Sequence, residues 1–156
     1  MTQTTSAPLP HFSTEQLQAL QGRMIVILPT QRYQLLMQWH QLSSDEGNIV
    51  LTHAASGRIA EMAWHKPQMY WRDNHDQPNW SRMTEAYLHE KGMVLKPWEI
   101  SQLLQGKMFA HFKSRDGRVW EGTFKKQYLK IEWIAEKGKL LIESLTKGQQ
   151  AILILQ

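Results

Sequence analysis

The sequence predicts an α+β protein in which short helices pack on a C-terminal antiparallel β-meander or a small curved, barrel-like sheet. Two turn signals, Asp116-Gly117 and Glu136-Lys137-Gly138, separate runs of alternating apolar residues and predict two hairpins. Before them, two leucine-containing segments end at Gly92 and Gly106, as helices commonly do. Together these patterns predict helices followed by a meander.

The first half of the chain predicts a mixture of elements. Ser13 or Thr14 caps a short helix that ends at Gly22, and a buried strand follows over 23–28. Residues 30–42 fit both a helical stripe and strand alternation, and we favour the helix. A strand is expected over 49–52. The segment 66–80 combines two prolines with aromatic residues that show no period, which predicts an ordered surface loop.

The second half predicts two helices and then strands. The helices are expected over 81–91 and over 97–105, the second opening on a proline. The strands are expected over 107–113, 119–124, 128–135, 139–145 and 151–155. The peptide LQG-Arg-Met around Gly22 is echoed by LQG-Lys-Met around Gly106, which fits either a duplicated helix–strand module or shared helix-stop chemistry.

Residues 1–12 contain threonine, serine and two prolines with little periodicity, which predicts a flexible N-terminal tail. The size of the chain indicates that a single domain, 13–156, follows, with possible halves 13–92 and 93–156. Its hydrophobic content of 42% and its seven tryptophans are sufficient for a core. The absence of cysteine excludes disulfides and thiol nucleophiles. The N-terminus does not resemble a signal peptide and no apolar run is long enough to cross a bilayer, so we expect a cytoplasmic protein with no membrane partner.

Positive charge is concentrated in the second half. The segment 107–139 holds nine Lys or Arg and four Asp or Glu, a net charge of +5, whereas the remainder has nine basic and ten acidic residues, a net charge of −1. Such asymmetry is typical of proteins with an anionic partner, and it is equally expected for the solvated face of a sheet.

One stretch of this half resembles a known family. Gly106-Lys107, the Asp116-Gly117-Arg118 turn and Gly122-Thr123-Phe124 resemble the first half of the Sm-like motif of RNA-binding small barrels. The match departs from that motif by one extra residue between the two glycines, and no second Sm motif follows Tyr128. The resemblance implies a barrel and carries over no binding residue.

We therefore predict a non-enzymatic accessory protein that binds nucleic acid through its basic, β-rich C-terminal surface. Lysine and arginine would neutralise phosphates, and exposed aromatic rings would stack on bases. The predicted binding residues are Lys113, Arg115, Arg118, Lys125, Lys126 and Lys130, with Phe109 and Tyr128 as stacking residues.

Two alternatives remain open. The first is a protein–protein adaptor or inhibitor subunit that uses the aromatic loop 66–82, because its residue types are enriched in binding hot spots. The residues concerned are Tyr70, Trp71, Arg72, Trp80 and Arg82. The second is a metal-dependent enzyme built on the His and Asp residues near that loop (His65, Asp73, His75, Asp76, His89 and Glu90), whose spacing matches no established metal motif. We expect no catalytic residue, metal or cofactor, and the oligomeric state is left open.

Overall fold

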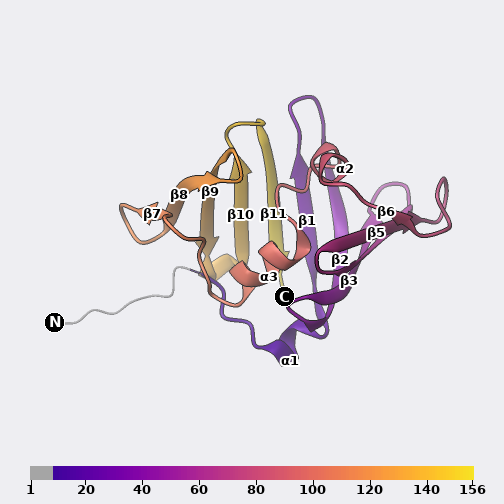
Figure 1. Ribbon diagram of the computed structural model, residues 1–156, viewed down its shortest axis with the longest axis horizontal. Helices are drawn as coiled ribbons and strands as arrows, with labels where there is room; N and C mark the ends of the chain where they lie inside the picture. Colours follow the sequence, from indigo (N-terminus) through magenta and orange to yellow (C-terminus); the bar gives the residue numbers. More distant parts are fainter. Residues whose placement is uncertain (1–8) are drawn as a thin grey trace.

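The fold is an open, strongly curved antiparallel sheet with short helices on its concave side (Figure 1). The computed structural model describes residues 9–156. Its eleven strands lie in the order β6-β5-β4-β3-β2-β1-β11-β10-β9-β8-β7. Their bounds are β1 Leu20–Ile27, β2 Arg32–Ser43, β3 Glu46–His53, β4 Ile59–His65, β5 Gln68–Asp73, β6 Ser81–Arg82, β7 Lys113–Ser114, β8 Val119–Phe124, β9 Gln127–Ile134, β10 Lys139–Ser144 and β11 Gln149–Leu155.

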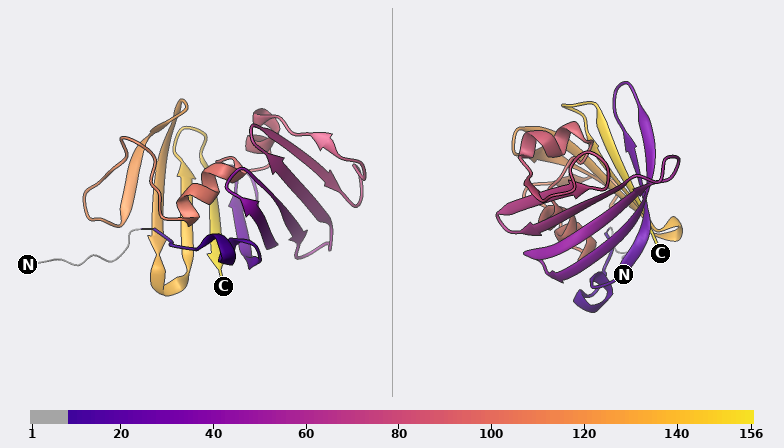
Figure 2. Two further views of the ribbon diagram at one scale, coloured as in Figure 1. Left: turned by 60° about the horizontal axis from the view of Figure 1, so that its bottom comes forward. Right: turned by 90° about the vertical axis from the view of Figure 1, so that its right-hand side faces the viewer.

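The first and last long strands meet in the middle of this sheet. Met24 of β1 lies opposite Leu153 of β11 and, on its other side, opposite Leu35 of β2. Every other pair of neighbouring strands is consecutive in sequence, so the strands form two meanders that join at β1 and β11. The segment 83–112 connects the edge strand β6 to the opposite edge strand β7 and crosses the concave side on the way (Figure 2).

Three α-helices and one 3-10 turn occur in residues 9–156. The helix α1 (Thr14–Leu17) begins with a capping box in which the Ser13 hydroxyl accepts from the Gln16 amide. The other helices are α2 (Glu85–Glu90), capped by Thr84, and α3 (Pro97–Leu104), which has proline at its first position; the 3-10 turn η1 covers Ala135–Lys137. None of these helices is long and apolar enough to span a membrane.

Strand alternation separates the core from the solvent. On β1, Met24 and Val26 point to the concave side and are 1% exposed, whereas Arg23, which precedes Met24, faces solvent. The helix α3 contributes Ile100, Leu103 and Leu104 to the same apolar cluster. None of the three α-helices in residues 9–156 covers the convex face (Figure 2).

The broad α+β prediction is confirmed, but the sheet is open rather than closed, and several elements differ from those expected. Residues 30–42 form the strand β2 instead of a helix, because Met37, Trp39 and Gln41 are buried at alternate positions. The segment 66–80 is largely the strand β5 and the turn that follows it, rather than a loop. The predicted helix 81–91 begins only at Glu85, because Ser81 and Arg82 pair with β5.

The predicted strand 107–113 is also wrong. Phe112 donates its amide to the Phe109 carbonyl in a turn, and His111 has a φ of +69°, so only Lys113 of this segment pairs in the sheet. The two LQG peptides differ as well. The first lies within β1, and the second ends α3.

Residues 1–8 of the predicted tail lie outside the described part of the chain. The rest of that segment packs on the domain, since Leu9 is buried and the Phe12 amide donates to the Leu104 carbonyl.

Candidate ligand-binding cavity

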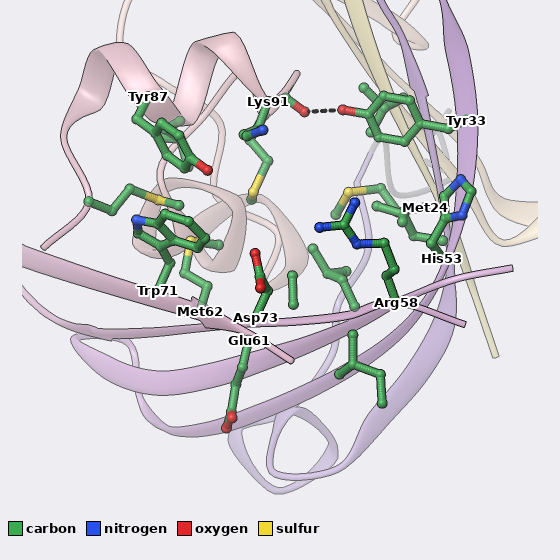
Figure 3. Close-up of a pocket in the computed structure, with 18 of the residues that line it drawn as sticks. Met24, Tyr33, His53, Arg58, Glu61, Met62, Trp71, Asp73, Tyr87 and Lys91 are labelled. Atoms are coloured by element: carbon green, nitrogen blue, oxygen red, sulfur yellow. Dashed lines mark hydrogen bonds between the residues drawn. The ribbon is translucent and has the colours of Figure 1, made fainter. Parts of the chain in front are cut away.

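The concave side holds a cavity of about 470 Å³ between strands β1 to β5 and the helix α2 (Figure 3). The two halves of the concave face are covered differently. Over β8 to β11, α3 and the stacked rings of Phe109 and Phe124, 4.3 Å apart, fill the space. Over β1 to β5 the short helix α2 places only Leu88 fully in the core. The space between β1 to β5 and α2 is therefore left partly unfilled.

The wall of the cavity is apolar and unusually rich in methionine. Met24, Met62 and Met93 are nearly fully buried, and Met83 is half-buried on the side of α2. Unbranched thioether side chains change rotamer easily and adapt to the shape of what they contact. Leu35, Leu51, Ile59 and Ala60 complete the wall on the sheet side.

Aromatic side chains stand at two sides of the cavity (Figure 3). The Trp71 ring of β5 stacks on Tyr87 of α2, with centroids 4.8 Å apart. On the other side, the Tyr33 hydroxyl donates a hydrogen bond of 2.6 Å to the Lys91 carbonyl. Burial raises the pKa of Tyr33 above its ordinary value, which is itself far above neutrality, and the hydroxyl donates at neutral pH. These contacts join the middle of α2 and its C-terminal cap to the sheet.

Charged groups gather at the mouth of the cavity. The Arg58 guanidinium pairs with Asp76 at 2.6 Å, and Asp73 accepts backbone N–H groups from His75, Asp76 and Gln77. These hydrogen bonds lower the pKa of Asp73, and the bonds from His75 and Arg58 lower that of Asp76. Glu61 points away from the cavity (Figure 3), and its carboxylate accepts two hydrogen bonds from Arg72.

Several of the residues predicted to bind nucleic acid are buried or already paired with acidic side chains. Phe109 is 6% exposed inside the core, and the Lys125 ammonium is 2.7 Å from the buried Glu99 carboxylate. Arg118 pairs with Glu132 at 3.5 Å, and the Tyr128 hydroxyl donates to Glu121. Lys113 and Lys130 both lie opposite Glu121 on neighbouring strands, while Arg115 and Lys126 are exposed in turns. Acidic residues therefore interrupt the basic stretch.

The residues predicted for a protein partner lie on two faces of β5 and at its end. Trp71 points into the cavity, whereas Tyr70 and Arg72 point to the convex side. Trp80 is 42% exposed, and the Arg72 guanidinium lies 4.3 Å from its ring centroid. Arg82 is exposed on β6. A protein partner for this region stays a prediction.

The candidate metal ligands also have other roles. His75 Nδ1 lies 2.6 Å from Asp76, and Asp73 caps its own turn. In residues 9–156, no three His, Asp or Glu side chains are arranged so that they could hold a metal ion.

Neither a family model nor a curated protein matches the sequence. Among solved structures, the chain is similar to a LolA superfamily protein from Nitrosomonas europaea. The match has 10% identity and a TM-score of 0.48, and it covers 96% of this chain and 88% of the other. An identity this low transfers no ligand or activity.

The nucleic-acid function predicted from the basic segment is wrong. The basic segment lies in an open curved sheet in which several of the predicted contact residues are buried or already paired. Pairing of Lys125 and Arg118 with carboxylates and burial of Phe109 account for side chains that the sequence pattern had assigned to phosphates and bases.

Of all the residues predicted for either binding surface, only Trp71 lines the cavity. The others that matter there come from separate elements, among them Tyr33, Arg58, Met62 and Lys91. One signal was present in the sequence. Reading residues 33–39 as a strand places Tyr33 and Leu35 on the same face as Met37 and Trp39.

Proposed function

We propose that this protein binds an apolar, flexible ligand in the cavity between the concave face of the sheet and α2. The observation that carries the proposal is the cavity itself, a space of about 470 Å³ with a methionine-rich wall and a charged mouth. Small-molecule sites typically occupy about 300–1,000 Å³ and combine an apolar lining with a few polar groups.

The chemistry of the wall supports an alkyl or acyl chain as the occupant. Each methylene group that moves from water to such a wall contributes about 0.8 kcal/mol. Four methionines can follow a chain that bends, whereas a wall of β-branched side chains would favour a single rigid shape. The deepest wall residues, Met24 and Leu88, present no polar atom that would need a partner in the ligand.

The test compares two substitutions on the same strand. Ala60 of β4 lines the cavity, whereas Ala63 lies on the opposite face of β4. Ala60→Phe places a ring in the cavity, and Ala63→Phe adds the same ring on the convex side as the matched control. Binding is measured by the fluorescence of N-phenyl-1-naphthylamine, an uncharged apolar probe, and by its displacement with dodecanol.

We expect wild type and Ala63→Phe to bind the probe with similar affinity and Ala60→Phe to bind it about tenfold more weakly or worse. Near-ultraviolet circular dichroism checks that both variants are folded. Equal binding by all three proteins, or no saturable binding by wild type, would overturn the proposal.

A further inference from the structure

The charged side chains at the mouth of the cavity differ in how many hydrogen-bonding atoms they leave free for a ligand. Arg58, Lys91, Asp73 and Asp76 all line it. Figure 3 shows the Arg58 guanidinium and the Asp73 carboxylate pointing into the opening, with Tyr33 and His53 on one side and Trp71 and Tyr87 on the other. The formal charges of these four side chains cancel, but the side chains differ in how many hydrogen bonds they already make within the protein.

Three of the four carboxylate oxygens of Asp73 and Asp76 already accept hydrogen bonds from other groups. Asp73 Oδ1 accepts the amides of His75, Asp76 and Gln77 at 2.9, 2.6 and 2.9 Å. Asp76 receives the Arg58 guanidinium on one oxygen and His75 on the other, each at 2.6 Å. Both side chains are therefore held in place, and a cationic ligand group would have to displace these bonds everywhere except at Oδ2 of Asp73.

The two cations keep donors free. Arg58 uses Nη2 for Asp76, and among residues 9–156 neither Nε nor Nη1 of its guanidinium has an acceptor. In the described chain, 9–156, no carboxylate lies within ion-pair distance of the Lys91 ammonium. That ammonium is 5.1 Å from the ring centroid of Tyr87, another residue of the cavity wall. Its backbone carbonyl is fixed by Tyr33 at 2.6 Å, so the root of the side chain is held at the mouth.

From this arrangement we infer that the cavity selects apolar chains that end in a single carboxylate, with the chain among the methionines and the carboxylate between Lys91 and Arg58. The inference rests on the proposed function and names its ligand class. Hydrogen bonds between cationic donors and a carboxylate are about twice as strong as neutral ones. Asp73 and Asp76, at the same mouth, disfavour a doubly charged group by repulsion.

The test uses three ligands of equal chain length, each below its micelle concentration: laurate, dodecanol and dodecyltrimethylammonium. Each displaces N-phenyl-1-naphthylamine from wild type, Lys91→Gln, Arg58→Gln and, as the matched control, Lys107→Gln, whose lysine is exposed outside the cavity. Because Arg58→Gln also frees Asp76, the double variant Arg58→Gln/Asp76→Asn separates loss of the cation from release of the carboxylate.

We expect wild type and Lys107→Gln to bind laurate about tenfold more tightly than dodecanol and to bind the ammonium analogue most weakly. Lys91→Gln, Arg58→Gln and the double variant should each lose most of the preference for laurate and retain the affinity for dodecanol. Equal affinity for laurate and dodecanol in wild type, or tightest binding of the ammonium analogue, would overturn the inference and leave the proposed function standing. Failure of both the probe and dodecanol to bind would overturn the proposed function and this inference with it.

Discussion

At the scale of single residues, Gly92 determines how closely α2 approaches the sheet. It follows the helix with a φ of +91°, in the left-handed region, and a Cβ at this position would lie 2.1 Å from Cγ1 of Val26. Glycine is therefore required twice here, for the backbone conformation and for the close contact. The same contact brings the end of α2 against the floor of the cavity.

We predict that Gly92→Ala destabilises the protein by about 2–4 kcal/mol, the sum of a left-handed alanine and an overpacked contact. Gly117→Ala is the matched control, because Gly117 has a φ of +76° and no atom within 4 Å of its added Cβ. The control should lose only about 1–2 kcal/mol. Urea unfolding followed by tryptophan fluorescence measures both, and equal losses would show that the contact with Val26 relaxes without cost.

At the scale of elements, α3 is held to the sheet by a turn of the β8–β9 hairpin. Lys125 and Lys126 form this two-residue turn, with φ angles of +48° and +71°, a conformation that side chains other than glycine and asparagine rarely adopt. Lys125 reaches Glu99 of α3, whose side chain is only 8% exposed. Burial opposes the charge of Lys125, but the hydrogen bond and the charge of Glu99 outweigh it, and the pKa of Lys125 is raised.

We predict that Lys125→Met destabilises the fold by about 1–3 kcal/mol, because it leaves the Glu99 carboxylate largely buried without its cation. Lys126→Met is the control. It has the same kind of backbone conformation, and no carboxylate in residues 9–156 pairs with its side chain. Thermal and urea unfolding measure the difference. If both variants lost the same stability, the effect would belong to the turn and not to the ion pair.

The elements differ in how far the sequence predicts them. The hairpin at Glu136-Lys137-Gly138 and the helix at Pro97 carry local signals, a turn that contains glycine and an N-terminal proline, and both are found close to the predicted places. The strand β2 fits two periods, and only its pairing with β1 and β3 decides between them. The cavity is less predictable still, because Tyr33, Trp71 and Lys91 are brought together by the curvature of the sheet and by α2.

At the scale of the whole molecule, the sheet depends on the pairing of its first and last long strands. Each of β1 and β11 has a neighbouring strand on both sides, whereas the edge strands β6 and β7 are only two residues long. The pairing of Gly22 with Leu155 joins residues that are far apart in sequence. Pairs between distant residues cost loop-closure entropy when they form. The pairing of β1 with β11 is the one that joins the two meanders into a single sheet.

We predict that backbone amides in the β1–β11 ladder exchange with deuterium only through global unfolding, whereas those of β6 and β7 exchange through local fraying. Native-state hydrogen exchange at increasing urea concentration measures the opening free energy of each strand. The expected result is that β1 and β11 share the highest value. A value for β11 as low as that for β7 would show that the two meanders are stable independently of their junction.

The direction of the two central strands has a mechanical consequence. Because they run antiparallel, the start of β1 and the end of β11 lie at the same end of their ladder, where Gly22 is opposite Leu155. A force that draws these two ends apart would load the hydrogen bonds of the ladder one after another, in the unzipping geometry, instead of loading them all at once, as in shear. Under tension the molecule would therefore tear at its centre first, while the segment 83–112 still tethers the two halves at their outer edges.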